Sequence, residues 1–223
     1  MERLSINEQE TIVLDLLNPY FQDFGFKRQL HQGMSSCFIA KTDFGVAFVM
    51  FHFISAGQTC FSLGLSYADI EKFMVSIGNP QVDFSNRILN DDYSGCTVYD
   101  SQQTVSYEHS KQSTSTTKGA ERFAQIVIDY METRGWAFLE RYSRLPNILN
   151  ELNTLHATGQ YWRKLLGGQA DHFLRGLRIA NLCNDPQILA KVTYVDNIFY
   201  DPQYNLHNWL PYYEKFKKEN NFI

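Results

Sequence analysis

The stretch from Phe44 to Ile54 constrains the fold of this chain more than any other part of the sequence. Its two alternating sets of positions are both apolar: Phe44, Val46, Phe48 and Met50 on one side, and Ala47, Val49, Phe51 and Phe53 on the other. A strand that is apolar on both faces lies inside its sheet. The apolar run is far shorter than the ~20 residues of a membrane-spanning helix, and it contains His52. We interpret it as a central β-strand.

The next segment, from Thr59 to Tyr67, alternates between large and small side chains. The large residues are Phe61, Leu63, Leu65 and Tyr67, and the small ones are Cys60, Ser62, Gly64 and Ser66. The links at 42–43 and 55–58 are short, which predicts antiparallel neighbours. The small face either lets a helix approach closely or forms the floor of a shallow groove. We take Cys60, Ser62, Gly64 and Ser66 as candidate binding residues.

A helix is expected before these strands. Ser5 and Glu8 have the spacing of a capping box, and apolar residues then recur at helical intervals up to Phe24. Gly25 supplies the stop, and Pro19 predicts a kink or a break inside the helix.

The remaining pattern gives the order of elements. We predict strands over Ser36–Lys41, Cys96–Tyr99 and Thr104–His109, and a helix over Ala68–Ile77. From Lys118 onward the periodicity is almost entirely helical. The sequence therefore predicts an α+β fold: an N-terminal helix on an antiparallel sheet, followed by an all-helical C-terminal half. The expected domains are a sheet domain over 1–117 and a helical region over 118–223 packed on it, with one continuous domain as the alternative.

Composition excludes several classes of protein. Apolar residues make up 44% and charged residues 20% of the 223 residues, as in ordinary globular domains rather than in disordered chains. Residues 1–109 hold 6 of the 20 basic and 13 of the 24 acidic side chains, whereas residues 110–223 hold the other 14 and 11. The pI of about 5.9 argues against nucleic-acid binding. The acidic half suits a basic partner, with Asp91 and Asp92 as candidate contacts.

The sequence holds none of the catalytic motifs that we sought. It contains no phosphate-binding glycine loop, no nucleophile elbow and no histidine pair at the spacing of a helical zinc site. We therefore expect no catalytic residues, no cofactor and no metal. The N-terminus does not resemble a secretory signal. The four cysteines show no C-x-x-C spacing and are too few for a disulfide scaffold. We therefore expect the protein in the reducing cytoplasm, with no membrane partner.

Aromatic residues crowd the last thirty positions, including Trp209, Tyr212 and Tyr213. Tyrosine and tryptophan are favoured at protein interfaces, but they also serve to close a core. We take these three as candidate binding residues, with core packing as the alternative. A homodimer formed through this segment is a further alternative.

Two short motifs suggest a family. The run Leu16-Leu17-Asn18-Pro19-Tyr20-Phe21 is followed by Gly25-Phe26-Lys27-Arg28 and then by a phenylalanine-rich strand. Over residues 5–75 this resembles a bacterial family of uncharacterised α+β domains that open with a helix, a Gly-Phe-Lys/Arg turn and an antiparallel meander. Some of its members act as immunity-type proteins. The element order is also similar to that of class I type III secretion chaperones, which are acidic dimers but lack a counterpart of residues 140–223.

These observations favour a non-enzymatic cytosolic module that binds a protein partner, of the immunity or chaperone type. Two alternatives remain open. One is an enzyme, for example a hydrolase that uses His52 or His109 with a nearby cysteine or carboxylate. The other is a dimeric scaffold.

Overall fold

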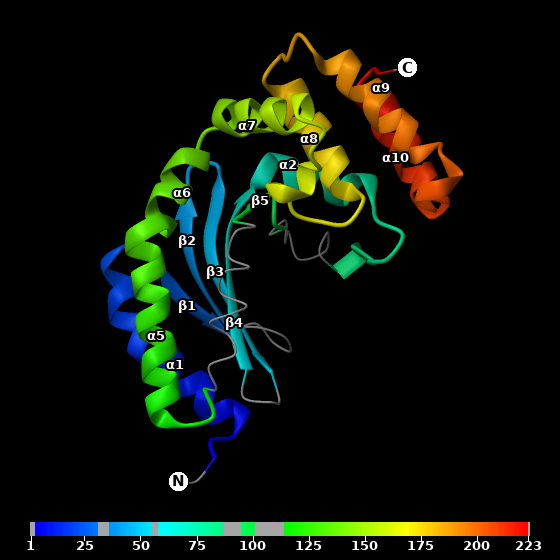
Figure 1. The fold of residues 1–223 in the computed structure, drawn as a ribbon. Helices are drawn as coiled ribbons and strands as arrows, with labels where there is room; N and C mark the ends of the chain where they lie inside the picture. Colours follow the sequence, from blue (N-terminus) through cyan, green and yellow to red (C-terminus); the bar gives the residue numbers. More distant parts are fainter. Residues whose placement is uncertain (1–2, 31–35, 55–57, 87–94, 101–113, 223) are drawn as a thin grey trace. The chain divides into compact units, whose positions relative to one another are not determined.

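The computed structural model describes residues 3–30, 36–54, 58–86, 95–100 and 114–222 (Figure 1). The strands are β1 (Lys27–Leu30), β2 (Ser36–Thr42), β3 (Gly45–Ile54), β4 (Gln58–Tyr67) and β5 (Val98–Tyr99). The longer helices are α1 (Ile6–Asp23), α2 (Ala68–Ile77), α5 (Thr117–Tyr130), α6 (Trp136–Tyr142), α7 (Leu145–Ala157), α8 (Asp171–Leu182), α9 (Ile188–Phe199) and α10 (Leu210–Glu219). The short helical turns are η2 (Met131–Gly135), η3 (Trp162–Lys164), η4 (Pro202–Tyr204) and η5 (His207–Trp209). The predicted α+β class is confirmed.

The strands form an antiparallel sheet in the order β1-β2-β3-β4-β5. β3 lies in the middle, as its two apolar faces predict. Phe38 of β2 pairs with Val49 of β3, and Lys27 of β1 pairs with Ile39 of β2. The sequence analysis missed β1, which is short and polar. The expected strand Thr104–His109 lies outside the described residues.

Clustering of contacts divides the chain into two compact units, each made of two segments. The sheet unit comprises Met1–Leu65 and Asp100–Arg141, and the helical unit comprises Ser66–Tyr99 and Tyr142–Ile223. The predicted sheet domain over 1–117 with a helical region over 118–223 packed on it, and the alternative of one continuous domain, stay predictions.

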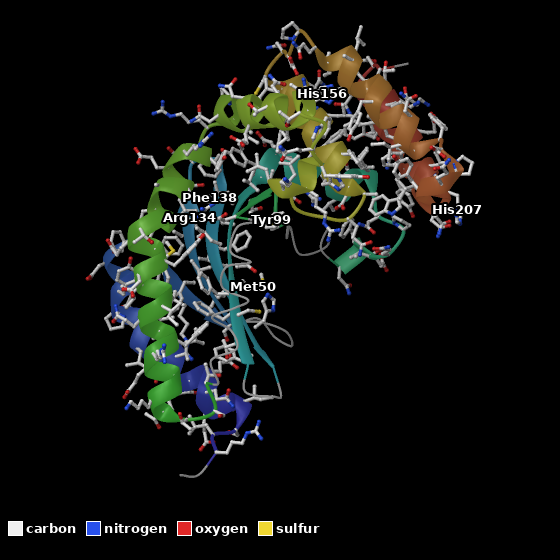
Figure 2. All side chains as sticks on the ribbon, in the orientation of Figure 1. Met50, Tyr99, Arg134, Phe138, His156 and His207 are labelled. Carbon is white, nitrogen blue, oxygen red and sulfur yellow. The ribbon has the colours of Figure 1, made fainter. Side chains whose placement is uncertain are left out.

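The core of the sheet unit is aromatic. α1 and α5 run side by side along one face of the sheet, as Figure 1 shows in blue and green. Between the helices and the sheet, Phe21 of α1 stacks on Phe38 of β2 at 4.6 Å between ring centroids. Phe123 of α5 contacts Phe51 of β3 and Phe61 of β4. The side chain of Met50, on the opposite face of β3, is half-buried (Figure 2). One face of the sheet therefore supplies this core.

The helix boundaries of the sheet unit follow local signals. The capping box of Ser5 and Glu8 is present, and Thr116 caps α5 by accepting from the Gly119 N–H. α1 continues through Pro19, so the predicted break does not occur there, and Gly25 follows the helix with a φ of 79°. α5 passes into α6 through η2, a π-helical turn. A Cβ on Gly135 would lie 2.5 Å from the Met131 sulfur, so the glycine lets the Met131 side chain pack closely against the turn.

The helical unit has a core of its own around Trp162. This side chain is fully buried, and a Cβ on Gly176 of α8 would lie 2.4 Å from its ring. The glycine therefore lets η3 pack directly on α8. Phe173 of α8 contacts the rings of Trp162 and Phe199, which ties α8 to η3 and α9. The tight packing of η3 places the residues on either side of Trp162 at the surface.

Candidate binding surface

The helical unit contains a pocket of about 570 Å³, called here the aromatic pocket. Four segments supply its lining: the turn after α2, the residues around η3, the start of α8, and the end of α9 with the following η4–η5 turns. The lining residues are Pro80, Gln81, Tyr161, Arg163, Gln169, Ala170, His172, Phe173, Ile198, Tyr204, Asn205, Leu206, Asn208 and Trp209. This volume lies within the range that holds a drug-sized molecule or a few side chains.

The floor of the aromatic pocket is apolar and its rim is polar. Phe173 and Trp209 are 3% and 4% exposed, whereas the rim residues Tyr161 and Tyr204 are 51% and 46% exposed. Arg163 is exposed and is the one Lys, Arg, Asp or Glu among the lining residues. An apolar floor beneath exposed tyrosines and a guanidinium favours a ligand that combines apolar and anionic groups.

His172 adds a buried polar group to this floor. Its Nδ1 bonds to the carbonyl oxygen of Gln169, which only accepts, so Nδ1 carries the proton and Nε2 is the acceptor. Burial lowers the pKa of His172 to about 4, so the ring is neutral at pH 7. Its Nε2 has no hydrogen-bond partner within the described part of the chain.

Local turns bring Trp209 to the pocket. Asp201 caps η4 by accepting from the Gln203 N–H at 2.9 Å. Asn205 then takes a left-handed conformation with a φ of 52°, which ends η4 before η5 begins. Asparagine tolerates this conformation better than most residues do. The turn therefore returns the chain so that Trp209 closes the floor.

A buried ionic network, called here the Arg175 network, holds the start of α8 behind this floor. Arg175 donates from Nε and Nη2 to the two carboxylate oxygens of Glu71, both at 2.8 Å, and from Nη1 to Asp171 at 2.5 Å. Thr97 donates to Glu71 at 2.7 Å, and the Gln169 N–H donates to Asp171 at 2.7 Å. Burial lowers the pKa of Arg175, but the two carboxylates outweigh burial and the net pKa is raised.

Glycines let the backbone approach the Arg175 network closely. A Cβ on Gly95 would lie 1.9 Å from a Glu71 oxygen, and one on Gly168, which has a φ of 106°, would lie 2.3 Å from Asp171. The Gly167-Gly168 pair lies in the connection between η3 and α8 and forms a turn. In the structure the pair also wraps a buried charge, with the Gly167 carbonyl accepting from Arg175.

A second hollow, called here the loop pocket, has a volume of about 510 Å³. Its lining residues are Val75, Gly78, Asn79, Pro80, Gln81, Val82, Asp83, Phe84, Ser85 and Tyr212. Asn79 accepts from the Gln81 N–H at 2.8 Å, which shapes the turn after α2. Hydrogen bonds from the side chain and the backbone of Ser85 lower the pKa of Asp83, so this carboxylate is ionised at pH 7.

The predicted C-terminal site residues have different positions. Trp209 lines the aromatic pocket and Tyr212 lines the loop pocket, with their ring centroids 6.4 Å apart. Tyr213 is fully buried, and its hydroxyl donates to Asp196 at 2.9 Å. Burial raises its pKa. The position of Tyr213 fits the core-packing alternative, and a part in binding stays a prediction for it.

Neither pocket includes the predicted small face of β4. Cys60 and Ser62 are half-buried, whereas Gly64 and Ser66 are buried. A groove at these positions stays a prediction. The predicted contacts Asp91 and Asp92 lie outside the described residues, as does His109.

The alternative of a hydrolase that uses His52 with a nearby cysteine or carboxylate stays a prediction. Burial raises the pKa of Cys60 and lowers that of His52, so both groups are neutral at pH 7. A nucleophilic cysteine needs the opposite shift of its thiol. The described residues contain no group of three or more His, Cys, Asp or Glu side chains that could hold a metal ion. Figure 2 shows His156 on α7 and His207 in η5 at separate places in the helical unit.

The sequence analysis missed Tyr161, Arg163 and Tyr204 on the rim. The only available signal was an aromatic and basic run, Tyr161 to Lys164, in a connection between two predicted helices. Connections often carry binding residues, but nothing local indicates which of their aromatics stay exposed.

No family model, curated protein or solved structure matches this chain. In the part of the chain that the structure covers, none of the helices has the length and apolar character needed to cross a membrane.

Proposed function

We propose that this chain is a non-enzymatic cytosolic module of the immunity or chaperone type that binds a protein partner, and that the aromatic pocket is its contact site. The observation that carries this proposal is the lining. Two half-exposed tyrosines and an arginine surround a floor that contains Trp209. Tyrosine, tryptophan and arginine are the residues most enriched at the energetic centres of protein interfaces.

The support behind the pocket is consistent with binding. The start of α8 is held by the Arg175 network, and η3 is held by the buried Trp162. A pre-organised site loses less conformational entropy on association than a mobile one does. The asparagine and glutamine side chains around the rim add adaptable hydrogen-bonding groups, as in other protein-binding surfaces.

The test uses capture from the native cytosol with the tagged full-length chain. We compare the wild type with a Tyr161→Ala, Tyr204→Ala double variant. The matched control is Leu189→Ala, which removes a side chain that is 69% exposed but does not line the pocket. A partner that binds the wild type and the control, and binds the double variant at least about 10-fold more weakly, supports the proposal.

Equal capture by all three proteins would contradict it, provided that thermal unfolding shows the variants to be folded. If the captured partner is a second copy of the chain, the molecular mass measured in solution will rise from that of a monomer to that of a dimer as the protein concentration increases. The dimeric scaffold is then the correct alternative.

A further inference from the structure

The aromatic pocket and the loop pocket meet along one stretch of surface. Pro80 and Gln81 line both of them. The rings of Trp209 and Tyr212, one in each pocket, lie edge to face three residues apart in the chain. A Cβ on Gly78 would lie 2.9 Å from the Tyr212 ring, so this ring packs directly on the backbone after α2. The two pockets therefore adjoin across a short ridge.

The combined size suits a chain segment better than a single small molecule. The pockets have volumes of about 570 and 510 Å³, and each alone reaches the size of a drug-binding site. An extended peptide advances about 3.3 Å per residue and points successive side chains in opposite directions. A segment of about six residues could place one side chain in each pocket while its backbone crosses the Pro80–Gln81 ridge.

The two pockets carry opposite charges. Among the lining residues that the structure describes, Arg163 is the one Lys, Arg, Asp or Glu of the aromatic pocket, and Asp83 is the one of the loop pocket. Both side chains are exposed. His172 contributes no charge at pH 7. A bound segment therefore meets a positive group in one pocket and a negative group in the other, which favours one orientation of the segment.

We propose that the two pockets form one site for an extended peptide segment of the partner, with an acidic residue of the segment at Arg163, a basic residue at Asp83 and apolar residues between them. This inference rests on the proposed function, because it describes the part of the partner that the module recognises. It adds that recognition depends on the order of charges rather than on the net charge of the partner.

The experiment measures binding of four synthetic peptides of about six residues, with acetylated and amidated ends and one shared Trp-Gly-Tyr centre. Two peptides carry a glutamate at one end and a lysine at the other, in either order. The other two carry glutamate at both ends or lysine at both ends. Binding to the full chain is followed by NMR shifts of the backbone amides of Arg163 and Asp83.

We expect one of the two mixed peptides to bind about 2–5-fold more tightly than either uniform peptide, because each exposed ion pair contributes modestly. Arg163→Glu should move the preference to the peptide with two lysines, and Asp83→Lys should move it to the peptide with two glutamates. The control is Lys164→Glu, which reverses the neighbouring exposed charge outside both pockets and should leave the preference unchanged.

The outcomes separate the two proposals. If no peptide shifts the pocket amides, the protein-binding pocket itself is wrong. If all four peptides bind the pockets with equal affinity, the function stands and the charge order is wrong. If the wild type binds the peptide with two glutamates or the peptide with two lysines most tightly, binding depends on the net charge of the peptide and this inference is wrong.

Discussion

Each unit contains an arginine paired with a carboxylate, and the two pairs differ mainly in depth. In the helical unit Arg175 and Glu71 are 8% and 1% exposed, and further groups complete the Arg175 network. In the sheet unit Arg134 binds both oxygens of Asp100, but Arg134 is 42% exposed while Asp100 is 3% exposed. The Tyr130 hydroxyl donates to the same carboxylate at 2.6 Å.

The same kind of arginine–carboxylate pair therefore contributes differently to the free energy of unfolding, according to how deeply the pair is buried. A charge removed from water is costly unless its partners replace the lost hydration, so loss of one partner in the Arg175 network leaves a buried charge. Solvent screens the Arg134 guanidinium, which is 42% exposed, so its attraction for the buried Asp100 carboxylate is weaker than that of Arg175 for Glu71.

Arg175→Met should destabilise the protein by about 3–5 kcal/mol, because the Glu71 and Asp171 carboxylates lose their buried counter-charge. Urea unfolding followed by circular dichroism measures the change. The matched control is the double variant Arg175→Met, Glu71→Leu, which removes both charges of the closest pair and should be less destabilised than Arg175→Met alone. A double variant as unstable as the sum of the two single variants would show that the pair is not coupled.

His172 lies on the same helix as Arg175 and is a buried titratable base, so its burial should make stability depend on pH. Its pKa is about 4 in the folded chain, against about 6.5 for an ordinary histidine, so protons bind preferentially to the unfolded chain. The wild type should therefore lose up to roughly 3 kcal/mol of stability as the pH falls from 6.5 to 4, in addition to other titrations.

His172→Phe keeps an aromatic ring and removes the titrating group. The difference in unfolding free energy between wild type and variant should therefore change by that amount between pH 7 and pH 4. The neighbouring charges of Asp171, Arg163 and Arg175 are present in both proteins and cancel in the difference. A difference that does not vary with pH would mean that His172 is not buried as described.

Arg134→Gln should cost only about 1–2 kcal/mol, because Asp100 keeps the Tyr130 hydroxyl, the glutamine amide can still donate a hydrogen bond, and solvent already screens the exposed guanidinium in the wild type. Chemical unfolding gives the value. Arg122→Gln on the exposed side of α5 is the control and should change stability by less than about 0.5 kcal/mol. A loss at Arg134 as large as that at Arg175 would mean that depth does not separate the two pairs.

Arg163→Glu should have the smallest effect on stability, within about 0.5 kcal/mol of wild type, because the side chain is exposed. Thermal unfolding of this variant beside Lys164→Glu provides the measurement. A larger loss of stability for Arg163→Glu than for Lys164→Glu would show that the Arg163 guanidinium stabilises η3 and is not free to bind a partner.

Much of the fold was predictable because its signals are local. The two apolar faces of Phe44–Ile54 indicated the central strand, and the start of α1 followed from the capping box of Ser5 and Glu8. β1 was missed because the pairing of Lys27–Leu30 with β2, rather than any pattern of its own, defines it as a strand. The π-helical turn at Met131–Gly135 was also missed, because its residues share the periodicity of the helices on either side.

The candidate site was only partly predictable. The sequence singled out Trp209, Tyr212 and Tyr213 together, but nothing in the pattern separated the two that line pockets from Tyr213, which packs in the core. The exposure of an aromatic side chain depends on which helix packs over it, and that helix comes from another part of the chain.

The sequence by itself determined the kind and the order of most elements, because helix and strand periodicity and capping act over a few neighbouring residues. Tertiary structure alone decided which charges are buried together: Arg175 meets Glu71 across 104 positions of the chain. The same holds for the two pockets, whose linings bring distant segments together. Burial and long-range pairing depend on the packing of whole elements, and no local pattern records them.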